Sequence, residues 1–325
     1  MLNLPILSPP ETSRAQTRRR LPPWLKRPLP AGRTFALTKR TVADSGVATV
    51  CQEARCPNLS ECWSAKTATF MILGDRCTRR CQYCAVSTAR PDPPAEDEPQ
   101  RLAQAVARLG LRHVVITAVA RDDLPDEGAG HFAACVRRIG QTRPQATVEV
   151  LPADFHARPD CIAAVCDAAP DIYNHNIETV ERLTPIVRPQ ARYRRSLDVL
   201  RIVKLLSPDM LTKSGLMIGL GETEDEITRT FEDLRQVDCD VLTVGQYLQP
   251  TPGHTPVARF YHPREFDRLA RVADDLGFVS AACGPFVRSS YNAAEVFARS
   301  RAAGNHTTPT SGSPERSGLD PREPS

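Results

Sequence analysis

The segment Ala68–Val86 reads ATFMILGDRCTRRCQYCAV, and it decides most of the interpretation of this chain. Its first part, Ala68–Leu73, is a short apolar run typical of a buried strand. Cys77, Cys81 and Cys84 follow in a C-x3-C-x2-C pattern that begins four residues after this run. If strands and helices alternate, the triplet lies in the first loop after a strand, where such folds carry their chemistry.

The sequence on both sides of this segment does alternate. Short, apolar and often β-branched runs predict strands at Ala68–Leu73, His113–Thr117, Thr147–Leu151, Ile172–Asn176, Ser214–Gly219, Asp240–Gln246 and Phe278–Ala282. Apolar residues at three- and four-residue spacing predict helices at Pro99–Leu109, Gly130–Ile139, Pro159–Ala168, Tyr193–Leu206, Glu224–Val237 and Pro263–Leu276. This order predicts parallel βα units with right-handed crossovers, and therefore an α/β fold. We expect a partial (β/α)6 barrel of the TIM type, with a doubly wound open sheet as the alternative.

Composition restricts the role of the cysteines. The chain has 325 residues, 11 cysteines, 25% charged residues and a formal net charge of +4. This length is enough to bury a core without disulfide or metal cross-links. The sequence shows no apolar run long enough for a membrane span and no secretory signal, so we expect a cytoplasmic protein. Stable disulfides are rare in that compartment, so the thiols need another explanation.

The two ends differ from the body. Residues 1–33 hold seven basic residues and one acid, a local charge of +6, which leaves −2 for the other residues. This basic, proline-rich arm is either a solvated leader or a surface for an acidic protein partner, and its prolines argue against a mitochondrial transit helix. The slightly acidic body argues against nucleic-acid binding. We expect an auxiliary segment at 34–66, the barrel at 67–301 and a disordered tail at 302–325.

The C-x3-C-x2-C triplet is typical of a metal centre with an open position. Structural zinc sites use four protein ligands, and no fourth cysteine or histidine lies close on this loop. Three thiolates suit a [4Fe–4S] cluster in which one iron is free to bind a substrate or cofactor. A second triplet, Cys51-x4-Cys56-x5-Cys62, lies just upstream and indicates a second cluster. Packing or zinc binding is the alternative for the upstream triplet.

The downstream triplet, with Tyr83 before its last cysteine, resembles the signature of the radical S-adenosylmethionine superfamily. The pair of triplets resembles lipoyl synthase, and the resemblance covers about residues 20–297. Besides Ala68–Val86, it rests on VITAVARDDLPDEGAGHF (Val115–Phe132), PDIYNHNIETVERL (Pro170–Leu183), TKSGLMIGLGETEDE (Thr212–Glu226), LTVGQYLQPTPGHTPV (Leu242–Val257) and CGPFVRSSYNA (Cys283–Ala293).

The resemblance implies a sulfurtransferase that inserts two sulfur atoms, at C6 and C8 of a protein-bound octanoyl-lysine. A 5′-deoxyadenosyl radical made from S-adenosylmethionine would abstract the hydrogens, and an auxiliary cluster would donate sulfur. The cofactors implied are two [4Fe–4S] clusters and S-adenosylmethionine. The partners implied are octanoylated lipoyl carrier domains (E2 subunits of 2-oxoacid dehydrogenases and the glycine cleavage H protein), a ferredoxin- or flavodoxin-type electron donor and iron–sulfur carrier proteins, with no nucleic acid and no membrane.

The same resemblance assigns ligands. Cys77, Cys81 and Cys84 would hold the cluster that cleaves S-adenosylmethionine. Cys51, Cys56 and Cys62 would hold the auxiliary cluster. A serine of the closing Arg288-Ser289-Ser290 motif would complete the auxiliary cluster, with Ser290 favoured and Ser289 as the alternative. Without the resemblance, this motif reads as an ordinary turn.

The resemblance also implies contacts to S-adenosylmethionine near the ends of strands, from Thr117, Asn174, Asn176 and Glu178, and from Arg188 in the IVRP segment. Asn176 and Glu178 also fit helix N-terminal capping, and Arg188 also fits a surface ion pair. His175 is expected to be a hydrogen-bonded barrel residue. Gly219–Glu222 would let the backbone approach adenine, or would simply form a turn.

Three positions depart from the family pattern: Ala120 stands for a usual Asp, and Glu127 and Ala89 stand for usual glycines. The other cysteines are expected to be small core residues; they are Cys135, Cys161, Cys166, Cys239 and Cys283. Two alternative functions remain open at this point. One is another sulfur-inserting radical enzyme, related to biotin synthase or to the tRNA methylthiotransferases. The other is a non-enzymatic zinc-binding scaffold.

Overall fold

The computed structural model describes residues 20–26, 33–54, 56, 58–64 and 69–290. Most of the arm 1–33 and the whole tail 302–325 therefore lie outside the described residues, as does residue 68 at the start of the first expected strand. Among the described helices, none combines the length and the apolar composition that crossing a membrane requires.

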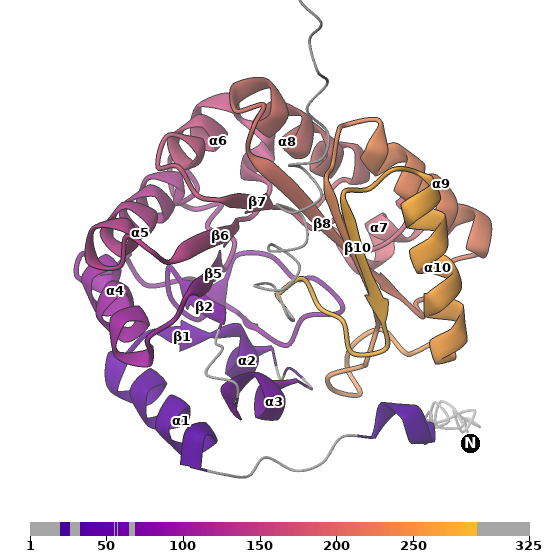
Figure 1. Ribbon diagram of the computed structural model, residues 1–325, viewed down its shortest axis with the longest axis horizontal. Helices are drawn as coiled ribbons and strands as arrows, with labels where there is room; N and C mark the ends of the chain where they lie inside the picture. The colour runs from indigo at the N-terminus through magenta and orange to yellow at the C-terminus, as the bar shows by residue number, and fades with distance from the viewer. Residues whose placement is uncertain (1–19, 27–32, 55, 57, 65–68, 291–325) are drawn as a thin grey trace, which may run out of the picture.

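One sheet of eight strands organises the chain, in the spatial order β1-β2-β5-β6-β7-β8-β9-β10. The strands are β1 (Ala48–Thr49), β2 (Thr69–Ile72), β5 (His113–Ala118), β6 (Thr147–Leu151), β7 (Ile172–Asn174), β8 (Leu211–Ile218), β9 (Val241–Gln246) and β10 (Ser280–Gly284). All neighbours pair in parallel except β1, which is antiparallel to β2. Because spatial order follows chain order without a reversal, the sheet is an arc of a barrel (Figure 1) and the doubly wound alternative is wrong.

A helix follows each of the six strands from β2 to β9, as the (β/α)6 prediction requires. These outer helices are α4 (Glu98–Leu109), α5 (Ala129–Thr142), α6 (Pro159–Cys166), α8 (Tyr193–Leu206), α9 (Glu224–Arg235) and α10 (Pro263–Asp275). The local sequence explains several helix starts. Thr223 and Glu226 form a reciprocal capping box on α9, and His262 and Glu265 form one on α10.

The segment before the barrel contains helices that the apolar pattern did not predict: α1 (Arg33–Ser45), α2 (Val50–Glu53) and α3 (Leu59–Ser64). α1 packs against α3 and α4. Trp63 is buried, its ring lies 5.7 Å from that of Phe35, and its carbonyl accepts a 2.9 Å hydrogen bond from Thr38. The first helical turn, η1 (Pro23–Leu25), lies beside α10, where Trp24 Nε1 donates to the carbonyl of Tyr261.

Inside the arc, a layer of buried side chains from β6, β7 and β8 is polar. Lys213 Nζ lies 3.0 Å from both carboxylate oxygens of Glu149, and neither side chain is exposed to solvent. The amide of Asn174 donates to the same carboxylate at 2.7 Å. Burial by itself would raise the pKa of Glu149, but the charge of Lys213 lowers it, and the pKa stays below its usual value. This charged, hydrogen-bonded layer is the floor on which the functional site rests.

Candidate active site

A cavity of about 470 Å³ opens at the carboxyl ends of the strands. Its wall contains residues from all parts of the expected site: Cys56, Cys77, Cys81, Cys84, Thr117, Asn176, Glu178, Arg188 and Ser290. The three cysteines of the downstream triplet lie in the loop after β2, and Thr117 lies in β5. Asn176, Glu178 and Arg188 follow β7, and Ser290 follows β10. Close packing of the strand ends thus brings together residues that are more than 200 positions apart in the sequence.

The loop of the downstream triplet is held by a small two-stranded sheet, β3 (Arg76–Cys77) with β4 (Ser87–Thr88). Main-chain N–H groups of Arg79 and Ala120 point at Cys77 Sγ from 3.4 and 3.3 Å. Burial raises the pKa of Cys84 to about 12 and also raises that of Cys81. Thiolates at these positions therefore need a positive centre, and an iron–sulfur cluster provides one. The free thiols facing one cavity fit such a cluster.

Arg79, inside this triplet, anchors the loop. Its guanidinium is 6% exposed and lies 2.6 Å from Asp122 and 2.7 Å from Asp154. The neighbouring hydroxyl of Thr78 donates to the carbonyl of Ala120 and to Asp122. Sequence reasoning missed this anchor, since a charged residue between cysteines gave no sign that it would be buried.

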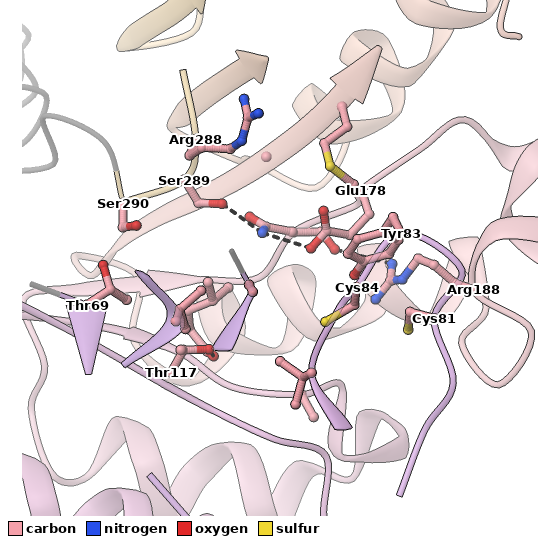
Figure 2. Close-up of a pocket in the computed structure, with 18 of the residues that line it drawn as sticks. Thr69, Cys81, Tyr83, Cys84, Thr117, Glu178, Arg188, Arg288, Ser289 and Ser290 are labelled. Carbon is pink, nitrogen blue, oxygen red and sulfur yellow. Dashed lines mark hydrogen bonds between the residues drawn. The ribbon is translucent and has the colours of Figure 1, made fainter. Parts of the chain in front are cut away.

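On the opposite wall, the side chains after β7 form one hydrogen-bonded group. Asn176 Nδ2 donates to Glu178 Oε1 at 2.9 Å and to Ser289 Oγ at 2.7 Å (dashed lines in Figure 2). Arg188 is buried and donates to the carbonyls of Asn176 and Ile177. Burial raises the pKa of Glu178, and the charge of Arg188 opposes that shift.

The alternatives for these residues are resolved by their contacts. The next helical turn, η3 (Glu181–Leu183), has Val180 at its N-cap and no side-chain cap, so the capping interpretation of Asn176 and Glu178 is wrong. Arg188 is not a surface ion-pair residue, because it is 7% exposed.

Three further expected positions differ in their surroundings. Thr117 lines the cavity, and its hydroxyl donates to the carbonyl of Leu151 at 2.7 Å. Asn174 does not belong to the cavity wall, because its side chain points to Glu149 in the polar floor. His175 is buried between the carbonyl of Pro152 and the hydroxyl of Ser196, as a hydrogen-bonded barrel residue should be.

The upstream triplet lines a second, smaller cavity. Cys51, Cys56 and Cys62 share it with Asn58, Thr69, Arg288 and Ser290. Ser289 is not part of this wall. In Figure 2, Ser290 and Thr69 lie close together, across the larger cavity from Cys81 and Cys84. Burial raises the pKa of Cys51, so this group of thiols also fits a metal cluster.

The segment that carries these cysteines is tied to the closing segment. Asn58 Nδ2 donates to the carbonyl of Phe286 at 2.6 Å, across 228 positions of sequence. Sequence reasoning missed Asn58 and Thr69 as wall residues. The position of Asn58 between the second and third cysteines was the available signal.

The departures from the family pattern are accommodated locally. Ala120 contacts the triplet loop through its main-chain carbonyl and N–H, which any residue at this position supplies. Glu127 has a left-handed backbone (φ 53°), which explains why glycine suits this position. Its carboxylate lies 2.9 Å from His156 Nδ1 and 4.0 Å from Arg79. Ala89 shows no comparable contact among the described interactions.

The remaining cysteines are packing residues, with one qualification. Cys135, Cys161, Cys166 and Cys239 are buried, whereas Cys283 on β10 is only partly buried against the core. None of the five lines either cavity. Their expected role as small core side chains is thus confirmed for the four buried ones.

Sequence comparison shows which known proteins this chain is similar to. Residues 71–234 match the family model of the radical SAM superfamily, and residues 10–56 match that of the N-terminal domain of lipoyl synthase. The chain is 55% identical to the lipoyl synthase of Rubrobacter xylanophilus, covering 84% of this chain and 85% of that one. It is 53% identical to that of Halalkalibacterium halodurans (85% and 91%) and 51% identical to that of Thermus thermophilus (86% and 87%).

Solved structures share the fold at low identity. Methylornithine synthase (PylB) aligns with a TM-score of 0.51 at 12% identity, covering 72% of this chain and 81% of that one. The hydrogenase maturase HydG of Carboxydothermus hydrogenoformans aligns with a TM-score of 0.52 at 12% identity, covering 70% and 65%. At this identity the likenesses concern the fold alone.

Proposed function

The chain belongs to the lipoyl synthase family of radical SAM enzymes, and on that premise we propose that its two cavities form one active site. Its function is that of a lipoyl synthase, a sulfurtransferase that inserts two sulfur atoms at C6 and C8 of an octanoyl-lysine on a lipoyl domain. Its cofactors are S-adenosylmethionine and iron–sulfur clusters. The observation that carries the two-cavity proposal is a shared wall: Cys56, Thr69, Arg288 and Ser290 line both cavities.

We assign one [4Fe–4S] cluster to each triplet of thiols. Cys77, Cys81 and Cys84 hold the first, and the auxiliary cluster is held by Cys51, Cys56, Cys62 and Ser290. When bound, the first supplies the electron that cleaves S-adenosylmethionine into a radical, and the second supplies sulfur. Ser290 rather than Ser289 is supported because only Ser290 lines the small cavity. A serine oxygen is a harder ligand than thiolate, so iron releases it more readily.

The cofactor lies, in this proposal, between the triplet loop and the residues after β7. Two buried polar atoms of this wall, Asn176 Oδ1 and Arg188 Nε, have no hydrogen-bond partner within the described part of the chain. Such atoms cost free energy unless a ligand satisfies them. Arg188 offers a donor for a carboxylate, and Asn176 offers an acceptor for an ammonium or hydroxyl group. Thr117 and Glu178 complete the wall, whereas Asn174 supports the floor.

Apolar side chains line part of the larger cavity. The octanoyl chain requires an apolar approach, and the larger cavity offers Val50, Met71, Val119, Leu151 and Met217 among its wall residues. C6 and C8 are unactivated carbons, so no acid–base pair is needed near them, and the chain's contribution there is orientation and shielding.

The partner is a lipoyl-domain protein. We propose E2 subunits of 2-oxoacid dehydrogenases and the glycine cleavage H protein as carriers. A ferredoxin or flavodoxin is proposed as electron donor, and iron–sulfur carrier proteins are proposed to rebuild the auxiliary cluster. The basic arm, with a charge of +6 in residues 1–33, supports an acidic carrier partner over a nucleic acid. We also propose a cytoplasmic location, consistent with the use of reduced thiols as ligands.

An anaerobic assay tests this function directly. It combines an octanoyl-lysine peptide, S-adenosylmethionine, a reductant and protein with about eight irons per chain. We expect deoxyadenosine and a dithiolated peptide. Cleavage of S-adenosylmethionine without sulfur insertion would contradict the proposed sulfur insertion and would support only radical SAM chemistry. About four irons per chain would contradict the two-cluster assignment, and colourless protein containing zinc would contradict both.

A further inference from the structure

The two consecutive serines of the closing segment face different parts of the site. Ser290 lines the small cavity with the upstream cysteines. Ser289 instead accepts a 2.7 Å hydrogen bond from Asn176 Nδ2, on the wall after β7. Figure 2 shows Ser289 directed toward the side chains near Glu178 and Ser290 directed toward Thr69. One peptide unit therefore joins the region of the upstream cysteines to the opposite wall of the larger cavity.

Asn176 depends on this contact for its orientation. An asparagine amide has two N–H donors, and here one goes to Glu178 and the other to Ser289. With both donors used, the amide is fixed with Oδ1 as the free acceptor, and Oδ1 has no partner in the described part of the chain. If Ser289 did not accept, the amide would keep only Glu178 and would rotate more freely about its terminal torsion.

Asn176 and the closing segment lie close against the backbone of two strands. A Cβ on Gly215 of β8 would lie 2.7 Å from Asn176 Oδ1 and 3.1 Å from Ser289 Oγ. A Cβ on Gly245 of β9 would lie 2.0 Å from the carbonyl oxygen of Val287. The closing segment and Asn176 are thus seated directly on two neighbouring strands, at positions where the absence of a side chain makes room.

We propose that Ser289 is a positioning residue that orients Asn176 for S-adenosylmethionine and thereby couples cofactor binding to the closing segment. This inference rests on the proposed function, because it takes the larger cavity as the cofactor site. Since Ser289 and Ser290 are adjacent, a displacement of Ser290 displaces the acceptor that holds Asn176. Coupling of this kind is reciprocal: an ordered closing segment favours cofactor binding, and bound cofactor favours the ordered segment.

The test measures cofactor affinity without turnover. S-adenosylmethionine is titrated anaerobically, without reductant, into cluster-loaded wild type, Ser289→Ala and the control Ser64→Ala. Ser64 is also a serine, but it is exposed, and its hydroxyl donates to the carbonyl of Ser60 within its own helix α3. We expect Ser289→Ala to raise the dissociation constant about five- to thirtyfold, as for a lost buried hydrogen bond, with iron content unchanged. Ser64→Ala should bind like wild type.

A double-mutant cycle separates positioning from general destabilisation. If Ser289 acts through Asn176, Asn176→Ala and the double variant Ser289→Ala/Asn176→Ala bind the cofactor equally weakly. Gly215→Ala provides an independent variant, because it keeps both hydrogen-bonding groups and only displaces them. We expect it to weaken binding by a similar factor.

Three results would overturn the inference. The first is a dissociation constant for Ser289→Ala within twofold of wild type. The second is the loss of about half the iron from Ser289→Ala with normal cofactor affinity, which would make Ser289 a cluster ligand. The third is strict additivity, in which the losses of binding free energy caused by Ser289→Ala and by Asn176→Ala add up in the double variant. By contrast, a wild-type protein that does not bind S-adenosylmethionine would contradict the proposed function itself.

Discussion

Arg79 and Asp154 meet at 2.7 Å across two loops, one carrying the downstream cysteine triplet and the other following β6. Both side chains are buried, and Asp154 also receives Arg195 at 3.2 Å. Burial by itself would raise the pKa of Asp154, but the hydrogen bonds from Arg79 hold it well below its usual range. The position of the triplet loop is therefore set by an ion pair that the cysteine spacing does not reveal.

Replacing Arg79 should destabilise the triplet loop more than replacing the neighbouring Arg80 does. Arg79→Met leaves Asp122 and Asp154 without their main partner, at an expected cost of about 3 kcal/mol. Arg80→Met is the matched control, because Arg80 is exposed. Thermal unfolding and iron content measure both variants, and we expect Arg79→Met to lose iron from the downstream triplet. Equal behaviour of the two variants would exclude the anchoring role.

Substitutions in the two cysteine triplets should affect different steps of the reaction. Cys51→Ala should retain about half of the iron and still cleave S-adenosylmethionine, because the downstream triplet is intact. Cys81→Ala should lose cleavage and sulfur insertion together. Deoxyadenosine and thiolated peptide, measured in the same reaction, check this. Formation of full lipoyl product by Cys51→Ala contradicts the assignment of the upstream triplet as the donor site.

The closing segment should not tolerate a side chain beneath it. Gly245→Ala places a methyl group 2.0 Å from the carbonyl oxygen of Val287, a contact that only movement of the segment relieves. Gly253→Ala meets only Thr251 Oγ1 at 3.8 Å and serves as the control. We expect Gly245→Ala to lose iron from the upstream triplet and to bind the cofactor more weakly. Wild-type iron content in this variant would show that the segment adapts.

Acid should destabilise the fold through His175. Burial, aided by the charge of Arg188, lowers the pKa of this histidine to about 4 from 6.5. Below pH 6.5, His175 binds a proton in the unfolded chain but stays neutral in the folded protein. The free energy of unfolding therefore decreases as the pH falls from 6.5 toward 4. At pH 5.5 the loss is on the order of 1 kcal/mol.

The measurement compares thermal midpoints at pH 7.5 and 5.5 for wild type and His175→Gln, whose side chain does not titrate. We expect the variant to show the smaller pH dependence, even if its stability at pH 7.5 is lower. An identical pH dependence in both proteins would mean that His175 is not the group responsible.

The fold was largely predictable, because apolar periodicity is a local property. The helix α8 has the predicted bounds Tyr193–Leu206, and every predicted strand is present. The N-terminal helices α1 to α3 were missed, because their apolar residues are few and their stability depends on packing, as Trp63 against Phe35 shows. The spacing of the thiols within each triplet predicts that they converge on one cluster, and the thiols of each triplet do line one cavity.

By itself the sequence determined the alternation of strands and helices, the two thiol triplets and the resemblance to one family. These depend on short-range spacing, which the chain carries before it folds. Only the tertiary structure decided that Ser290 and not Ser289 lies with the upstream cysteines, that Asn174 belongs to the floor, and that Arg79 is buried. Each of these depends on which side chains the closing of the barrel brings within about 3 Å, and such contacts join residues too distant in sequence for any local pattern to record.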